Sequence, residues 1–395
     1  MKLKDRLINA VLAIARIVFG ITFVFSGFVK AVDPVGFAYK IEDYLISFQL
    51  LEFIPLALTF AVGLILLEFL LGVFILLGLY RKITSTLALL FMAVMTPMTL
   101  YIALANPVAD CGCFGDALII SNWATFYNNI VLLAISIVLV VNSNRILPLF
   151  STKSAKSKNY VLGFVFLFSL LFFLYNILYL PIMDFRPYKV GVNIPEQMQD
   201  DLSKGDVYEN IYIYEKDGVE QEFTEDNFPW EDTTYTFVDY TSKLIKKGDK
   251  PLIDEFHILA YAKDTSGAFV ATGDITDDVL AQPITLFVVS LSLNKASSKA
   301  MKQIVALADY AANKHIDLLI ATSSDAKTVE QWHRQWGNPA NVNYAQMDEL
   351  TLKTIIRSNP GLLLLNKGTI QGKWSSRNLP TASKLDAIIG RLKAH

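Results

Sequence analysis

The sequence predicts an α-helical membrane bundle followed by an α/β domain in water. The bundle is indicated by composition: 53% of the residues are hydrophobic, 18% are charged and the mean hydropathy is +0.39, which is too apolar for an ordinary soluble chain. The order of the segments separates the two parts, because long apolar runs fill the first 180 residues and strand-like and helix-like segments alternate after them. Charge changes at the same place, from slightly basic to acidic.

Five apolar stretches are each long enough, at about 20 residues, to cross a bilayer core as a helix. They are approximately Leu7–Val29, Ile54–Leu79, Ile83–Ala105, Trp123–Val141 and Tyr160–Leu180. We expect four of them to form a bundle and the fifth to carry the chain back across the membrane.

Basic residues orient these spans, because Lys and Arg near span ends prefer the cytoplasm. The basic residues near span ends that we use for this orientation are Lys2, Lys4, Arg6, Arg81, Lys82, Arg145, Lys153, Lys156 and Lys158. They predict an inner-membrane protein with a cytoplasmic N-terminus and a periplasmic region after Leu180. Lys30 and Lys40, in the predicted first outer loop, are the exceptions.

The first span also has the basic start and apolar stretch of a signal peptide. Its apolar run is longer than a usual signal core, and no small-x-small cleavage site follows it. We therefore expect the span to be retained. Cleavage would leave four spans with the same orientation.

The two cysteines of the chain, Cys111 and Cys113, lie in the loop predicted between the third and fourth spans. With Gly112 relaxing the backbone between them, the thiols are close enough to bridge, and disulfides persist in the outer compartment. So small a ring should be strained, and strained disulfides tend to be more oxidising. The pair is therefore predicted to accept electrons.

Such chemistry needs one sulfur as the thiolate. Asp110 and Asp116 discourage a thiolate by raising its pKa, unless Lys30 or a helix terminus compensates. A structural disulfide and a pair of inert thiols in a tight turn are the alternatives. No metal site is predicted, because two thiolates need further ligands and all four histidines lie far along in the aqueous part.

Two ionisable residues, Arg16 and Glu68, lie inside the first and second predicted spans. A charge in hydrocarbon is costly unless it is paired or hydrated. Counted from the inner ends, both residues reach about 15 Å into the membrane, so we expect an Arg16–Glu68 pair. We interpret it as a structural clasp, with proton or quinone handling as the alternative.

The first part of the chain resembles a known family through an ordered set of motifs. They are Arg16-x3-Gly20-x6-Gly27-x2-Lys30, Asp33-Pro34, Glu68-x3-Gly72-x5-Gly78 and Asp110-Cys111-Gly112-Cys113-Phe114-Gly115-Asp116. Together they resemble the DoxX superfamily of four-helix membrane proteins, and the cysteine segment resembles its MauE branch, named for methylamine utilisation. The glycines permit close helix contact.

The resemblance covers roughly residues 8–145 and implies a four-helix bundle with a role in thiol- or quinone-linked electron transfer. It implies that Cys111 and Cys113 are the catalytic pair and that they help disulfide formation in an exported partner. A membrane quinone is the candidate terminal acceptor.

After the fifth span, the predicted elements follow the order of a thioredoxin-like fold. Early strands are expected at Ile211–Tyr214, Val219–Phe223, Tyr235–Asp239 and Phe256–Ala260. Strand, helix, strand, helix, hairpin and helix then follow at Ile284–Ser290, Ala296–Lys314, Ile316–Ala321, Asp325–Trp336, Leu362–Trp374 and Ala382–Leu392.

The segment from Leu286 to Ser297 resembles the first core strand and active-site turn of TlpA-type thioredoxin-like proteins. Pro360 falls where those proteins carry a cis-proline. Asn294 and Ser297 replace the cysteines of the turn, so thiol chemistry cannot be carried over to this domain. The resemblance implies a degenerate domain that docks a partner, and an unrelated α/β domain is the alternative.

We divide the chain into a DoxX/MauE-like domain (1–150), a basic inner loop with the fifth helix (151–185) and a thioredoxin-like domain without CxxC (186–395). The leading function is thiol–disulfide exchange with an exported or periplasmic protein. The rival is a non-catalytic membrane scaffold or assembly factor whose outer domain binds a partner. The sequence shows no nucleic-acid patch or phosphate loop and leaves the oligomeric state open.

Overall fold

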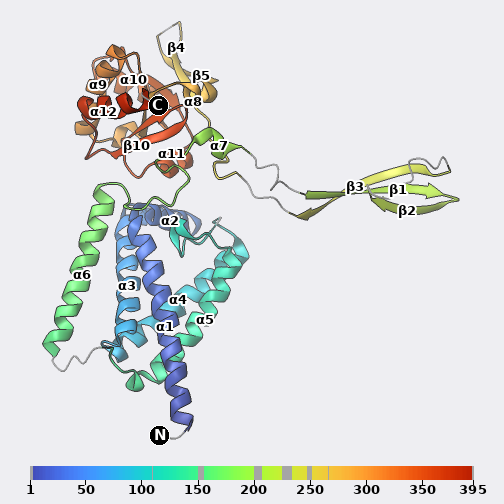
Figure 1. The fold of residues 1–395 in the computed structure, drawn as a ribbon, viewed down its shortest axis with the longest axis vertical. Coiled ribbons are helices and arrows are strands. Elements are labelled where there is room, and N and C mark those ends of the chain that lie inside the picture. The colour runs from blue at the N-terminus through green and yellow to red at the C-terminus, as the bar shows by residue number, and fades with distance from the viewer. Residues whose placement is uncertain are drawn as a thin grey trace.

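A helical bundle stands at one end of the molecule and an α/β domain at the other in the computed structural model (Figure 1). The structure describes residues 3–108, 110–149, 155–199, 207–224, 234–246, 251–265 and 267–393. Lys2, Lys153 and the boundary drawn between 150 and 151 lie outside these ranges. Five helices in the described ranges are long and apolar enough to cross a membrane, which confirms the expected number of spans.

The spanning helices pack as a group with one outlying member (Figure 1). They are α1 (Leu3–Val32), α3 (Ala57–Leu77), α4 (Arg81–Ala105), α5 (Asn122–Val141) and α6 (Ala155–Leu178). Helix α1 packs along α3 and α4 packs along α5, while α6 lies against α1 and α3. Apolar side chains remain exposed on the outside of all five helices, as expected for surfaces that face lipid.

A short helix, α2 (Pro34–Ser47), lies across the end of the bundle that faces the α/β domain (Figure 1). It occupies the segment predicted as the first outer loop. The Asp33 carboxylate accepts a hydrogen bond from Gly36 N at 2.9 Å, and Pro34 is the first helical residue. Both features are typical of a helix start. The helix buries Ala38, Ile41 and Tyr44, so it is part of the bundle's packing.

Glycines allow α1 and α3 to approach each other closely. A Cβ added to Gly72 would lie 2.6 Å from the backbone nitrogen of Val24, and one added to Gly27 would lie 2.9 Å from that of Phe69. These distances are far below van der Waals contact, so a larger residue would separate the helices. The close approach agrees with the glycine spacing in the sequence.

The α/β domain is built on a seven-stranded sheet in the order β10-β9-β6-β7-β8-β4-β5. The strands are β4 (Leu259–Lys263), β5 (Phe269–Asp274), β6 (Thr285–Ser290), β7 (Asp317–Thr322), β8 (Asn343–Gln346), β9 (Gly361–Asn366) and β10 (Thr369–Ser375). Strands β6, β7 and β8 are parallel, and β9 runs antiparallel to β6. All six residues of β6 are buried, as expected for a central strand with both faces covered.

Helices cover both faces of this sheet. Side chains of α9 (Ser298–Asn313), α10 (Ala326–Gln335) and α12 (Ala382–Lys393) share one hydrophobic core with Leu286 and Val288 of β6. Side chains of α7 (Ile194–Met198), α8 (Thr276–Ala281) and α11 (Glu349–Ile355) share a second core with Phe287 and Val289. Successive side chains of β6 therefore point alternately into the two cores. The fold is thioredoxin-like, as predicted.

The residues at the degenerate turn meet as that fold requires. Ser297 caps α9 by accepting a hydrogen bond from Ala300 N, and its own N–H donates to Asn359 O at 3.2 Å. The Asn359–Pro360 peptide bond is cis. Asn294 is exposed on a short 3-10 turn beside them.

Three differences from the prediction concern edges and connections. The strand expected at Phe256–Ala260 is β4, a few residues later, because Phe256 and Ile258 instead enter the second core. Strands β5 and β8 and helices α8 and α11 were not predicted. Their few residues give too little periodicity to be recognised in the sequence.

Strands β1 (Val207–Lys216), β2 (Val219–Thr224) and β3 (Thr236–Lys246) form a separate antiparallel sheet in the order β2-β1-β3. It projects away from the α/β domain (Figure 1). A turn at Asp217-Gly218 joins β1 to β2, and both residues have positive φ, at 55° and 79°. Phe237 and Tyr240 are 52% and 59% exposed on this sheet.

We predict that Gly72→Val destabilises the bundle by about 1–3 kcal/mol, because the added side chain overpacks α1 against α3. Thermal unfolding of the detergent-solubilised protein measures the effect. Gly63→Ala is the matched control in the same helix, since a Cβ there meets no atom within 4 Å. Equal stabilities of the two variants would contradict the close α1–α3 contact.

Candidate functional site

The cysteines lie in the loop between α4 and α5, at the end of the bundle nearest the α/β domain. Asn122 ties the two ends of this loop together, because its Nδ2 donates to Asn106 Oδ1 at 2.9 Å and to Val108 O at 3.1 Å. Gly112 and Gly115 have φ values of +64° and +52°, which favour glycine. The segment from Asp110 to Asp116, called the cysteine segment below, turns tightly across the bundle end.

Cys111 is the more buried of the two thiols, at 5% exposure, and Cys113 is half-buried. Both are free thiols. The Cys111 Sγ lies 3.5 Å from Thr125 Oγ1 and accepts a hydrogen bond from Cys113 N at 3.3 Å. Tyr44 of α2 donates to the Cys111 carbonyl at 2.6 Å. The backbone and the sulfur of Cys111 are therefore both held in place.

The two thiols differ in acidity. A hydrogen bond from the Cys113 thiol is the main cause that lowers the pKa of Cys111 to about 7, and Thr125 and the charge of Lys30 act in the same direction against the effect of burial. The pKa of Cys113 is raised well above its ordinary value, first because it gives that hydrogen bond and then because its thiol is shielded from water. Cys111 is thus the thiolate of the pair near neutral pH.

A buried ion pair lies directly below the cysteine segment. Lys30 Nζ is 2.7 Å from Glu68 Oε2 and donates to Ser26 Oγ at 3.0 Å. Ser26 in turn donates to the Cys113 carbonyl. The Lys30 and Glu68 side chains are only 6% and 8% exposed. Lys30, expected in a loop, therefore belongs to the last turn of α1 and places its charge beside the thiols.

The predicted Arg16–Glu68 pair is wrong. Arg16 donates to the carbonyls of Ile75 and Leu76 at the end of α3 and to that of Leu147 at 2.6 Å. Carbonyls at the end of a helix lack partners within the helix and attract cations. The helices are offset, so that the level of Glu68 in α3 corresponds to Lys30 in α1, and counting residues from assumed span ends missed this offset.

Other groups fix the first half of the cysteine segment. Lys40 of α2 donates to Asp110 Oδ2 at 2.8 Å, and Asp110 Oδ1 accepts from Gly112 N at 2.9 Å. A Cβ on Gly112 would lie 3.1 Å from Lys40 Cγ, so the segment passes close over this side chain. Lys40 thereby balances the acidic charge that the sequence placed next to Cys111.

The second half packs on α1 and reaches the α/β domain. The Phe114 ring lies 5.9 Å from that of Phe25, and a Cβ on Gly115 would lie 3.1 Å from Val29 Cγ1. Asp116 Oδ2 is 3.3 Å from Arg357 Nη2. Every member of the cysteine motif is thus in contact with a neighbouring element.

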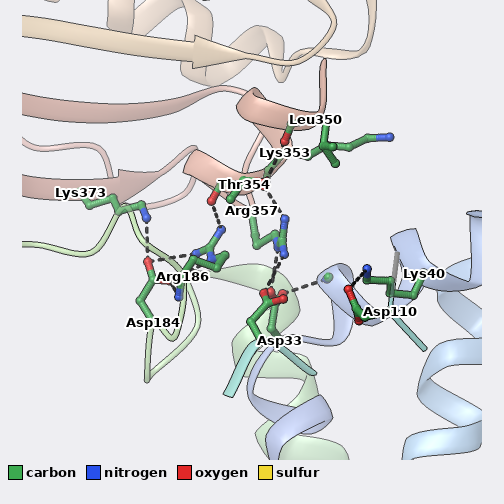
Figure 2. Close-up of polar contacts among 12 residues, drawn as sticks. Asp33, Lys40, Asp110, Asp184, Arg186, Leu350, Lys353, Thr354, Arg357 and Lys373 are labelled. Atoms are coloured by element: carbon green, nitrogen blue, oxygen red, sulfur yellow. Dashed lines mark hydrogen bonds and ion pairs between the residues drawn. The ribbon is translucent and has the colours of Figure 1, made fainter. Parts of the chain in front are cut away.

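A cleft of about 670 Å³ separates the bundle from the α/β domain next to this segment. Its walls include Gly112 and Lys30 from the bundle, Phe185 from the connection after α6, Lys353 from α11 and Arg357 just after it. Figure 2 shows the polar contacts along one side of the interface. Clefts of this size between domains are common ligand sites.

A second polar cluster joins the connection after α6 to the sheet (Figure 2). Asp184 pairs with Arg186 at 2.8 Å and with Lys373 of β10 at 2.7 Å. Burial raises the pKa of Asp184, but the two cations outweigh it and the net shift is downward. Burial and the nearby Arg186 lower the pKa of Lys373 to about 8.

The degenerate turn of the α/β domain faces the bundle. Burial raises the pKa of Glu42 in α2, and the charges of Lys353 and Lys295 oppose that rise. Lys295 belongs to the turn that contains Asn294. The edge that lacks cysteines therefore lies near α2, the helix that holds Asp110 and Cys111.

Sequence reasoning identified the cysteine motif and Lys30 but missed most of their partners. The missed residues are Ser26, Tyr44, Thr125 and Arg357, and Asp33 and Lys40 were named without their contacts here. The Asp33-Pro34 capping signal could have revealed α2 and with it Lys40 and Tyr44. Arg357 gave no signal, because it meets Asp33 across 324 residues. In the described residues, no group of three or more His, Cys, Asp or Glu could hold a metal ion.

The geometry defines a membrane protein whose bundle presents an asymmetric cysteine pair beneath an α/β domain. Residues 8–142 match the family model described as "Methylamine utilisation protein MauE", in agreement with the resemblance found from the cysteine motif. Residues 208–247, which contain most of the projecting sheet, match a domain of unknown function, DUF8463. No curated protein matches the chain.

Solved structures similar to this chain include three that cover 35% of it. One is a provisionally assigned thioredoxin from Neisseria meningitidis, 19% identical, with 90% of that chain covered and a TM-score of 0.26. Another is a peroxiredoxin-like protein from Aquifex aeolicus, 10% identical, with 82% covered and a TM-score of 0.24. The third is the mitochondrial 2-Cys peroxiredoxin of Plasmodium falciparum, 13% identical, with 89% covered and a TM-score of 0.25. The thioredoxin-like fold assignment rests on the sheet order given above.

We predict that Lys30→Gln destabilises the protein by about 3–5 kcal/mol, because it leaves the Glu68 carboxylate buried without a counter-charge. The double variant Lys30→Gln/Glu68→Gln should recover most of this loss. Thermal unfolding in detergent measures both. A double variant as unstable as the single one would show that the buried charge is not the cause.

We also predict that the rate of Cys111 alkylation rises with pH about a midpoint near 7, because only the thiolate reacts. At pH 7, Cys113 should react more than about ten-fold more slowly, since its thiolate is scarce. Mass spectrometry distinguishes the two sites. In unfolded protein both midpoints should return to about 8.5. A folded-state midpoint of Cys111 at that value would contradict the assigned acidity.

Proposed function

We propose that the chain is an inner-membrane thiol–disulfide redox protein in which Cys111 and Cys113 exchange electrons with an exported partner. The observation that carries this proposal is the asymmetry of the pair, one acidic and one weakly acidic thiol above the Lys30–Glu68 ion pair. A purely structural turn does not need such asymmetry. The division into 1–150, 151–185 and 186–395 belongs to the same proposal.

The asymmetry supports a direction of attack. A disulfide breaks most readily when the sulfur with the lower pKa leaves. A partner thiolate would therefore attack Cys113 Sγ, and Cys111 would leave as the thiolate. The partner's second thiol then attacks the mixed disulfide and releases Cys113. The partner loses two electrons and two protons and becomes a disulfide, and the membrane pair is left as two thiols.

The proposed orientation places the α/β domain and the cysteines in the periplasm and the N-terminus in the cytoplasm. Arg81, Arg145 and Lys156 lie toward the opposite end of the bundle from the α/β domain, in agreement with the preference of basic residues for the cytoplasm. The exceptions, Lys30 and Lys40, are neutralised by Glu68 and Asp110.

Continued turnover requires an acceptor for the two electrons of the reduced pair, and a membrane quinone is the acceptor that we propose. The interdomain cleft supports it, because apolar walls such as Phe37 and Phe185 meet Lys30 and Gly112 there. A bound quinone would supply two-electron acceptance at this position. The residues of the chain would exclude water and keep the cysteine segment in place.

A non-catalytic scaffold remains the second candidate. The exposed Phe237 and Tyr240 of the projecting sheet favour it, because exposed aromatic side chains are common at sites of protein contact. The absence of cysteines at Asn294 and Ser297 also agrees with a binding role for the α/β domain.

The test is a redox titration of the purified, detergent-solubilised protein against dithiothreitol, read by thiol alkylation and mass spectrometry. We expect a reversible Cys111–Cys113 pair with a potential close to those of dedicated oxidants, about −120 to −180 mV, and reoxidation on addition of quinone. Cys111→Ser is the control that cannot form the pair. Thiols that never pair, or a bond that resists reduction until the protein unfolds, would refute the redox function and leave the scaffold.

A further inference from the structure

Arg357 links the α/β domain to the cysteine segment. It follows α11, and its Nε donates to Asp33 Oδ2 at 2.8 Å while its Nη2 donates to Asp116 Oδ2 at 3.3 Å (Figure 2). Its Nη1 donates to the carbonyl of Lys353 in α11. The side chain is only 7% exposed. Few conformations satisfy all three acceptors, so the guanidinium is fixed at the domain interface.

This one side chain acts on both ends of the cysteine segment. It holds Asp116 directly. Through Asp33 it holds the first turn of α2, and α2 carries Lys40, which binds Asp110, and Tyr44, which binds the Cys111 carbonyl. Loss of Arg357 would therefore release Asp116 and loosen the helix that fixes the other end.

Arg357 also balances the negative charge of Asp33 and of Asp116 in the cysteine segment. Burial raises the pKa of Asp116, and Arg357 is the strongest opposing influence. Burial lowers the pKa of Arg357, but Asp33 and then Asp116 raise it to a net upward shift. Without the guanidinium, two carboxylates would face the cysteine segment without their main counter-charge. A thiolate beside them would be less stable.

We propose that Arg357 is a positioning residue for the Cys111–Cys113 pair, so that the α/β domain, which has no redox cysteines of its own, controls the reactivity of the thiols in the membrane domain. The inference rests on the proposed function only for its biological meaning. The physical claim concerns the reactivity of Cys111 and holds for the reduced protein without partner or quinone.

Charged and titratable groups from every packed element surround the thiols or the rest of the cysteine segment. They are Lys30 of α1, Lys40, Asp43 and Tyr44 of α2, Glu68 of α3, Asp110 and Asp116 of the cysteine segment, and Arg357 after α11. A variant at Arg357 changes one charge in this set and leaves the thiols and the Lys30–Glu68 pair in place.

The test is the pH dependence of Cys111 alkylation in the reduced, full-length Arg357→Gln protein. A rise of the midpoint by about one unit from 7 would slow the reaction at pH 7 about five-fold, because the thiolate fraction falls from about one half to about one tenth. Arg357→Gln/Asp116→Asn should recover part of the rate, because it removes the uncompensated carboxylate. Arg357→Lys is the second variant, to be used if Arg357→Gln folds poorly. It keeps the charge, so its midpoint should rise by less than one unit.

Lys353→Gln is the matched control. Lys353 lies in α11, just before Arg357, and packs over the same ring of Tyr39, but its carboxylate partner is Glu349 in its own helix. We expect its pH profile to match that of the wild type. A wild-type midpoint in Arg357→Gln, an equal shift in Lys353→Gln, or a faster reaction at every pH without a shift would each overturn the proposal. An inert pair in the redox titration would instead refute the proposed function and leave this result standing.

Discussion

The ion pair between Lys30 and Glu68 is the interaction on which the rest of the site depends. Both charges are buried at the end of the α1–α3 contact, and each would be costly there without the other. The pair fixes the helices at the level where Ser26 reaches the Cys113 carbonyl. It also provides the positive charge that helps to make Cys111 acidic. Packing, electrostatics and thiol chemistry therefore meet at one contact.

The sequence predicted what depends on local pattern. The five spans follow from length and hydropathy. Strand β6, Thr285–Ser290, whose side chains enter both cores of the α/β domain, follows from a continuous apolar run. The cysteine motif was found because two thiols are conspicuous in a chain that has no others. These features are properties of neighbouring residues, so they can be recognised without the fold.

The prediction failed for contacts that depend on how two helices are offset or on how the two domains are placed. Arg16 and Glu68 were paired by counting from assumed ends, but the offset of α1 against α3 is set by packing at Gly27 and Gly72. Arg357 and Asp116 are 241 residues apart and meet only because α11 lies over the bundle. Tertiary offsets of this kind leave no periodicity to detect.

The connection after α6 gives the interdomain contacts a further property. Helix α6 ends at Leu178, and Asp184 is already bonded to Lys373 of the sheet, so six residues limit the separation of the domains to roughly 20 Å. Docking of the α/β domain is thus an intramolecular event at a high effective concentration, on the order of millimolar. Contacts too weak to hold two separate proteins together therefore suffice to keep the α/β domain against the cysteine segment. The strength of this docking is independent of how much of the protein the membrane contains.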